Sequence, residues 1–356
     1  MKKPKILAYY LPQFHEIQEN NEWWGEGFTE WTALNSAKSY FKSQNIRKPI
    51  SPYYQYELPS KDVMEWQAKI ARDHHIDGFF VWDYWFGNGK RLLSKPKEYV
   101  RDHGIDFPYA LIWANHSWYN KGKNILLMEQ QYLGKKDYYT YAMDCLSHFV
   151  TDNYIKINNA PVFGIFMPSA VPDLQLFIET FEFVAINNGF SGIYWVAENS
   201  SNEDVFANSF NAVISSSKYF SVRKWKHPLF FIREQLIKRF NWNFMGPICY
   251  DYRKLVSSKD SFESSESPAI FSGWDTTPRH GNRGTYLENF NNETFSSHLD
   301  NVFQHAIIYQ VDFLAIKSWN EWAEGNVLEP DSEFGYSLLS VIKNKIKSSF
   351  DVGGEI

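Results

Sequence analysis

The chain has 356 residues, a formal net charge of −5, 44% hydrophobic residues and 22% charged residues. These values indicate a globular protein with a large core, and the negative charge excludes a general attraction to nucleic acid. Aromatic residues reach 18%, with 14 Trp. This surplus favours carbohydrate stacking or a large aromatic interface.

Short apolar runs alternate with amphipathic stretches along the chain, which is typical of parallel strands covered by helices. Eight runs predict strands, at residues 6–10, 78–82, 109–113, 162–166, 193–197, 212–215, 269–272 and 313–316. Helical patterns lie between them, at 61–75, 136–150, 173–188, 295–308 and 332–345. We therefore expect an α/β fold, a single (β/α)8 TIM barrel over residues 1–356 whose long βα loops form a carbohydrate cleft. A doubly wound sheet is the alternative, but its usual glycine-rich phosphate loops are absent.

In such a barrel, functional residues gather where strands end and βα loops begin. Polar and aromatic residues follow six of the eight predicted strands. The candidate binding residues are Tyr10, Gln13, His15, Trp24, Glu30, Trp31, Asp83, Tyr84, Trp85, Asn115, His116, Trp118, Glu198, Trp274, Asp275, Arg279, Trp319, Asn320 and Trp322. Each also has a structural explanation when taken alone: Asp83 or Asp275 could cap a helix, for example.

Glu321 and Glu324 lie three residues apart at the end of the last apolar run, among Trp319 and Trp322. Two carboxylates about 5 Å apart repel by roughly 3 kcal/mol at a dielectric near 20, or about 2 pKa units. One glutamate could then hold a proton while the other accepts one, as glycosidic bond cleavage requires. The alternative is that one glutamate caps a helix and the other is solvated.

Several segments resemble the WbsX-like proteins of surface polysaccharide loci, which are similar to glycoside hydrolase family 99. The first lie at 8–15, 22–25 and 27–31, and the others at 76–79, 113–115, 274–279, 320–325 and 328–330. Together they cover nearly the whole chain. The resemblance implies a (β/α)8 barrel and metal-independent, retaining cleavage of α-linked glycans, including mannan-like or surface polysaccharides.

By this resemblance, Glu321 is the general base that takes the proton from the sugar 2-OH, so that a 1,2-anhydro sugar forms. Glu324 is the acid that protonates the departing oxygen and later the base that activates water or a sugar hydroxyl. Two departures limit the transfer. Ala323 stands where the mannosidases tend to have His, and His116 stands where WbsX-like sequences more often have Glu.

Two other functions remain open from the sequence. A WbsX-type glycosyltransferase or transglycosylase of O-antigen, capsule or lipopolysaccharide biosynthesis is the first, although no two aspartates form a D-x-D signature for a metal-bound sugar nucleotide. A non-catalytic carbohydrate-binding protein is the second. Dependence on an activated donor would separate transfer from hydrolysis.

The remaining features of the sequence concern cofactors, location and partners. No metal ligand set or cofactor motif stands out, and Cys145 and Cys249 suggest no disulfide framework. We expect a cytoplasmic protein, because neither a signal peptide nor a transmembrane segment is recognisable. Residues 218–240 are basic and amphipathic. They either associate weakly with a membrane or a lipid-linked glycan, or form the solvated face of a helix, which is the commoner case.

Overall fold

The computed structural model describes residues 3–120, 123, 125–198, 209–240, 242–257, 262–264 and 266–350. Its central sheet is parallel along the order β12-β10-β9-β8-β4-β2-β1-β15-β13. These strands are β1 (Lys5–Tyr10), β2 (Gly78–Trp85), β4 (Tyr109–Trp113), β8 (Ala160–Ile165), β9 (Tyr194–Glu198), β10 (Ala212–Ile214), β12 (Glu266–Ser267), β13 (Ile270–Phe271) and β15 (Phe313–Lys317).

Only Pro268 and Ala269 separate β12 from β13, so one chain segment supplies both ends of this sheet. Its first part pairs with β10, and its second part pairs with β15. The segment thus acts as one broken strand that closes the sheet into an eight-stranded barrel. The predicted fold class is confirmed, and every predicted apolar run coincides with a barrel strand.

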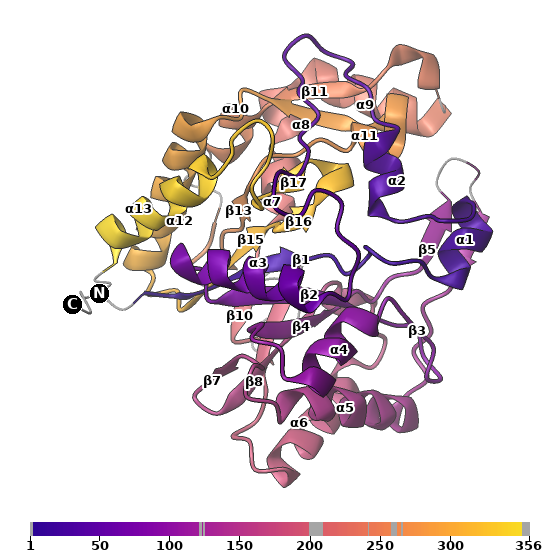
Figure 1. Ribbon diagram of the computed structural model, residues 1–356, viewed down its shortest axis with the longest axis vertical. Coiled ribbons are helices and arrows are strands. Elements are labelled where there is room, and N and C mark those ends of the chain that lie inside the picture. The colour runs from indigo at the N-terminus through magenta and orange to yellow at the C-terminus, as the bar shows by residue number, and fades with distance from the viewer. Residues whose placement is uncertain are drawn as a thin grey trace.

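Helices cover the outside of the barrel (Figure 1). They are α3 (Lys61–Asp73), α4 (Lys95–His103), α5 (Lys135–Phe149), α6 (Leu174–Asn187), α12 (Asn292–Ile308) and α13 (Ser337–Ser349). The five predicted helices all exist, but the last begins five residues later than the expected start at 332. Asp331 is the reason, because it accepts hydrogen bonds from the backbone of Glu333 and Phe334 and holds this stretch as a turn.

Large side chains fill the barrel interior. Tyr9 contacts Phe80 and Trp82, with ring centroids 5.4 and 4.9 Å apart. Gly164 on β8 makes room for Phe80, because a Cβ atom at this position would lie 2.4 Å from the Phe80 ring. The interior is therefore a packed core, as in other small barrels, and a site has to form at its mouth.

The connections after the strands carry short additional elements, several of which surround the mouth of the barrel. They are α1 (Gln18–Trp24), α2 (Glu30–Asn35), β3 (Arg91–Leu92), β5 (Trp118–Asn120), β6 (Ile125–Met128), β7 (Lys156–Ile157), η1 (Pro168–Ala170), α7 (Ser217–Ser221), α8 (Arg223–Lys226), α9 (Pro228–Phe240), η3 (Asn243–Met245), β11 (Ile248–Asp251), α10 (Tyr252–Val256), α11 (Thr277–His280), η5 (Gly281–Arg283), β14 (Thr285–Glu288), β16 (Asn320–Glu321), η6 (Trp322–Glu324) and β17 (Asn326–Val327).

Candidate active site

The glutamate pair lies in a small hairpin that follows β15. Strand β16 pairs antiparallel with β17, and η6 forms the turn between them. Gly325 ends η6 in the left-handed conformation (φ 55°), and a Cβ there would lie 2.7 Å from the Cβ of Asp275. Only glycine meets both conditions. The hairpin therefore holds Glu321 and Glu324 beside the segment that carries Asp275 and Arg279.

Glu321 is held at the inner side of the mouth. Its Oε1 accepts a hydrogen bond from the indole N–H of Trp82 at 2.9 Å. Burial, and next to it the nearby charge of Glu324, raises the pKa of Glu321 to about 7. The phenol of Tyr84 shares this environment, because burial and then the charge of Glu321 raise its pKa.

Glu324 is bound by Arg279 from α11. The guanidinium Nη1 lies 2.5 Å from Oε1 of Glu324, and Nη2 lies 2.9 and 3.0 Å from the two carboxylate oxygens of Glu30. Glu30, at the start of α2, also accepts the backbone N–H of Ala323 at 2.8 Å. Burial raises the pKa of the Glu30 carboxyl. Arg279 thus connects three segments that are distant in the sequence.

We call Glu30, Arg279, Glu321 and Glu324 the rim cluster. It combines three carboxyl groups with one guanidinium, so full ionisation would leave an excess of two negative charges in a largely buried place. Taking up one proton relieves part of this repulsion. Arg279 and Glu324 are still 33% and 17% exposed at their side chains, so the cluster reaches solvent. Such a cluster can both donate and accept a proton near neutral pH.

Beneath the rim cluster, Lys317 at the end of β15 lies among aromatic rings. Its Nζ lies 4.8 Å from the ring centroid of Tyr9 and 5.8 Å from that of Trp82. It forms an ion pair with Glu198, which also accepts hydrogen bonds from the Tyr9 hydroxyl and, at 2.6 Å, from Ser216. This network fixes the floor of the mouth.

Glu329 lies behind the hairpin and is fully buried. Its carboxyl accepts hydrogen bonds from Tyr56 (2.8 Å), Gln67 (2.7 Å) and Trp322 (3.0 Å). Burial raises its pKa to about 7. Trp322 lies between Glu321 and Glu324 in the sequence. Because Glu329 binds Trp322, it holds the η6 turn in place from behind.

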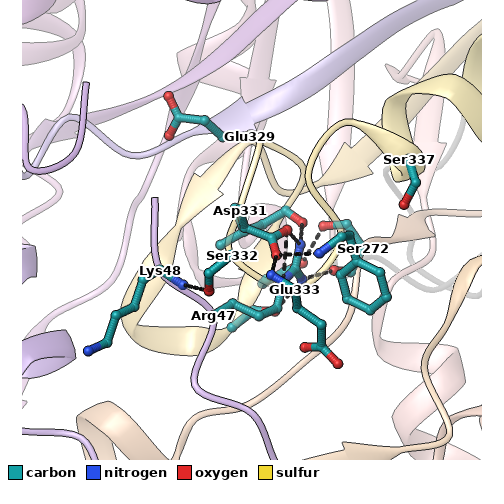
Figure 2. A network of polar contacts seen from close by, with 12 residues as sticks. Arg47, Lys48, Ser272, Glu329, Asp331, Ser332, Glu333 and Ser337 are labelled. Carbon is teal, nitrogen blue, oxygen red and sulfur yellow. Dashed lines mark hydrogen bonds and ion pairs between the residues drawn. The ribbon is translucent and has the colours of Figure 1, made fainter. Parts of the chain in front are cut away.

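A second support for the hairpin comes from the loop before α3. Arg47 forms a buried ion pair with Asp331 at 2.6 Å and donates to the backbone oxygens of Val327 (2.7 Å) and Ser272 (2.9 Å) (Figure 2). The close-up also shows that Glu329 points away from this network. Arg47 therefore connects the hairpin to the residue that follows β13 on one side and to the turn before α13 on the other.

The predicted site residues divide into groups. Glu30, Tyr84, Arg279, Glu321 and Glu324 come together at the rim, and Glu198 joins the floor. Trp319, just before the hairpin, and Asn320 and Trp322, within it, are buried. The side chain of Asn320 bonds the backbone N–H and oxygen of Leu11. The ring centroids of Trp31 and Trp322 lie 6.1 Å apart, and the indole N–H of Trp31 donates to the backbone oxygen of Tyr56.

Five predicted residues point to other partners. Tyr10 donates to Gln67, and Asp83 binds Lys97 and Tyr141. Trp85 donates to Asp137 and stacks on Tyr141, and Asn115 bonds the backbone of Met167. Asp275 caps the turn at Thr277 and accepts a hydrogen bond from Gln44. Strand alternation explains why Tyr10, Asp83 and Trp85 point away from the site, because neighbouring residues in a strand face opposite sides of the sheet.

The remaining candidates lie in the surrounding loops. Trp118 packs against Trp23 and Tyr84, His116 packs against Phe166, and Trp274 packs against Phe220. Trp24 is exposed and packs on Phe28, while Gln13 is half-buried and its backbone oxygen accepts from Glu30. His15 is buried, and this burial lowers its pKa to about 4.

Sequence reasoning missed Tyr9, Trp82, Lys317, Arg47 and Glu329 as parts of the site and its support. Tyr9 and Trp82 lie in apolar runs, and such runs give no sign of which residues face the barrel interior. Within the described ranges, no group of three or more His, Cys, Asp or Glu side chains is arranged to hold a metal ion. None of the helices in those ranges has the length and apolar composition that crossing a bilayer requires.

Comparison with known proteins places these features in a family. The chain matches the family described as Glycosyltransferase WbsX over residues 6–342, and it belongs to that family. Two proteins of Xanthomonas campestris pv. campestris, from strains B100 and ATCC 33913 and both named WxcX, are 28% identical over 362 residues. That alignment covers 99% of this chain but 51% of the relatives, so the chain spans about half their length.

Solved structures show the same barrel. A glycoside hydrolase-like protein aligns with a TM-score of 0.58 and 13% identity, over 97% of this chain and 94% of that one. The GH99 endo-alpha-mannosidase of Bacteroides thetaiotaomicron in complex with BIS-TRIS-propane aligns with a TM-score of 0.55 and 10% identity, over 97% and 98% of the two chains. At these identities, the likeness establishes the fold.

Proposed function

We propose that the protein is a retaining glycoside hydrolase that cleaves an α-linked oligo- or polysaccharide, with Glu321 and Glu324 dividing the proton transfers. The observation that carries this proposal is the rim cluster. It gives the two carboxyls of one short hairpin unequal surroundings: Glu324 pairs with Arg279, whereas Glu321 accepts from Trp82. Arg279 is also under the electrostatic influence of Glu321. The (β/α)8 fold and the family support a carbohydrate substrate, and no cofactor is required.

In the first step, Glu321 accepts the proton of the sugar 2-OH while O2 attacks C1. The bond between C1 and the leaving oxygen breaks, Glu324 protonates that oxygen, and a 1,2-anhydro sugar remains. In the second step, Glu324 accepts a proton from water, whose oxygen attacks C1. The C1–O2 bond opens, and Glu321 returns its proton to O2. Two displacements at C1 retain the anomeric configuration.

The pKa of Glu321, near 7, suits a general base at neutral pH, because a base works best when its pKa lies near the operating pH. The first step also needs one proton on the rim cluster. This proton has to reside on Glu324 when the bond breaks. We infer that substrate draws Arg279 away from Glu324 and towards Glu30, to which it is already bound.

Glycosyl transfer is the second candidate, and the description of the family favours it. A retaining mechanism with the same two glutamates can pass the sugar to a hydroxyl group in place of water. A transferase of the WbsX type would instead depend on an activated donor. A protein that only binds carbohydrate would keep its affinity in the variant Glu321→Gln. Neither the wild type nor the variant would then show turnover.

The test is incubation with a panel of α-linked oligosaccharides and the polysaccharide of the host organism, followed by NMR of the product anomers. We expect cleavage without an activated donor, retention of configuration, and the same rate in the presence of a chelator. Initial release of the inverted anomer would overturn the double displacement. Strict dependence on a sugar nucleotide would overturn hydrolysis in favour of transfer.

A further inference from the structure

Helices α8 and α9 and the short helix η3 carry large apolar side chains that project into solvent. Trp225 is 77% exposed, and Leu229 and Phe244 are each 80% exposed. Ile232 and Phe240 are also exposed on α9. We call these five residues the α8–α9 patch. Apolar groups gathered in this way on a soluble domain mark an interaction surface.

The patch is not the face by which α9 packs on the protein. That face is formed by Ile237, which is buried, and by Glu234, which accepts from Tyr250 at 2.6 Å and pairs with Arg223 at 3.2 Å. Leu229, Ile232 and Phe240 are spaced by three and eight residues, so they share a different face of the helix. The exposed stripe is therefore additional to the packing surface.

The exposed charges beside the patch are positive, although Lys218 is paired with Glu266 and Arg223 with Glu234. Residues 218–240 contain seven Lys or Arg and a single acid, Glu234, which is buried against the protein. Lys224 and Lys226 are exposed on either side of Trp225, and Lys224 Nζ lies 5.4 Å from its ring centroid. Arg239 lies beside Phe240 in the same way, at 6.0 Å. Aromatic rings flanked by cations suit the boundary between acyl chains and anionic headgroups.

We propose that the α8–α9 patch docks the protein on the surface of an anionic lipid bilayer. Its apolar side chains enter the headgroup region while Lys224, Lys226 and Arg239 contact the anionic headgroups. A second copy of the chain is a poorer occupant, because a self-complementary interface would bring the two positive surfaces together. The solvated-face interpretation of this segment does not account for its exposed Trp, Leu and Phe side chains.

The patch lies at the same end of the molecule as the rim cluster. In Figure 1, α8, α9 and β11 lie near α2 and α11, the helices that carry Glu30 and Arg279. Helix η3, which carries Phe244, contacts η5, and η5 directly follows α11. Docking would therefore bring the mouth of the barrel close to glycans that are attached to the membrane. The docking itself is independent of the reaction proposed above.

The experiment is sedimentation of the full chain with vesicles of phosphatidylcholine alone and of phosphatidylcholine mixed with phosphatidylglycerol. We expect retention on the anionic vesicles that falls as salt is added. The triple variant Trp225→Ser/Leu229→Ser/Phe244→Ser should bind at least about tenfold more weakly, and so should Lys224→Gln/Lys226→Gln. The matched control is Phe183→Ser/Ile186→Ser, which removes exposed apolar side chains from α6 and should bind like the wild type.

Circular dichroism and the unfolding midpoint should be unchanged in all variants, because the substituted side chains are exposed. Failure of the wild type to sediment with anionic vesicles would overturn the proposal. Equal binding by the triple variant would overturn it too. Concentration-dependent dimers that the triple variant abolishes, without vesicle binding by the wild type, would assign the patch to self-association instead. Since no turnover is measured, these results leave the proposed reaction untouched.

Discussion

Trp82 and Asp83 are neighbours on β2, yet they belong to two charged regions with opposite properties. Trp82 faces the barrel mouth and bonds Glu321 of the rim cluster. Asp83 faces the helices outside, where it pairs with Lys97 at 2.6 Å and accepts from Tyr141 at 2.8 Å. Lys97 also lies 3.7 Å from Asp144. We call Asp83, Lys97 and Asp144 the outer cluster.

The two clusters differ in charge balance and in access to solvent. In the outer cluster, Arg91 supplies a second cation to Asp144, so two cations face the two largely buried carboxylates, and Asp83 and Lys97 are each only 2% exposed. Arg91 also pairs with the more exposed Glu98 at 3.4 Å. In the rim cluster, one cation faces three carboxyls, and the group reaches solvent. A balanced, closed cluster stabilises a fold, whereas an unbalanced and accessible one can exchange protons with a ligand. This difference predicts distinct effects of substitution.

Neutralising the rim cluster should have the largest effect, and the effect should be on turnover. We expect Glu321→Gln and Glu324→Gln each to lower the rate by about 10²–10⁴-fold, because each removes one proton transfer. The free energy of unfolding should not fall, since the substitutions relieve repulsion between carboxylates. The measurement is the initial rate on the glycan identified in the panel. Glu26→Gln, an exposed change in the same group of loops, is the control and should keep full activity.

Breaking the outer cluster should instead affect stability. Lys97→Met leaves the buried Asp83 carboxylate without its cation, which costs about 3–5 kcal/mol. Chemical denaturation measures the loss, and Lys95→Met on the same helix is an exposed control that should change stability by less than about 0.5 kcal/mol. A loss of turnover in Lys97→Met at full stability would contradict the division between the clusters.

Glu329 combines properties of the two clusters. It is buried like the outer cluster, but none of its three hydrogen-bond donors is a cation. Its folded pKa of about 7 lies above its ordinary value of 4.5, so the folded protein holds this proton more tightly than the unfolded chain. The stabilisation is complete below about pH 4.5 and is lost as the pH rises through 7. It amounts to roughly 3 kcal/mol, from about 1.4 kcal/mol for each pKa unit.

Glu329→Gln should remove this pH dependence, because the amide stays neutral. Denaturation of the variant and the wild type at about pH 5 and about pH 8 gives the difference in slope. Glu333→Gln, an exposed change in the following turn, should behave like the wild type. Parallel pH dependence in Glu329→Gln and the wild type would show that Glu329 is ionised in the folded protein at both pH values.

The sequence predicted the strands of the barrel well because these strands are buried on both faces. A strand buried on both faces consists of consecutive apolar residues and is easy to recognise. It placed Glu321 and Glu324 near each other because the two residues lie in one hairpin of eight residues, Asn320 to Val327. It could not decide between Tyr9 and Tyr10, since both are aromatic and buried, and an apolar run hides which residues face inwards. Arg47 was missed for another reason: its partner Asp331 is 284 residues away.

The central claim is that Glu321 and Glu324 are close enough to share one proton. The direct measurement is a pH titration of ¹³C-labelled glutamate carboxyls by NMR, with Glu329→Gln as the background to remove the other group that titrates near 7. We predict one resonance with a pKa near 7 that disappears in Glu321→Gln and moves to lower pH in Glu324→Gln. A Glu321 resonance whose titration is the same with and without Glu324 would contradict the account.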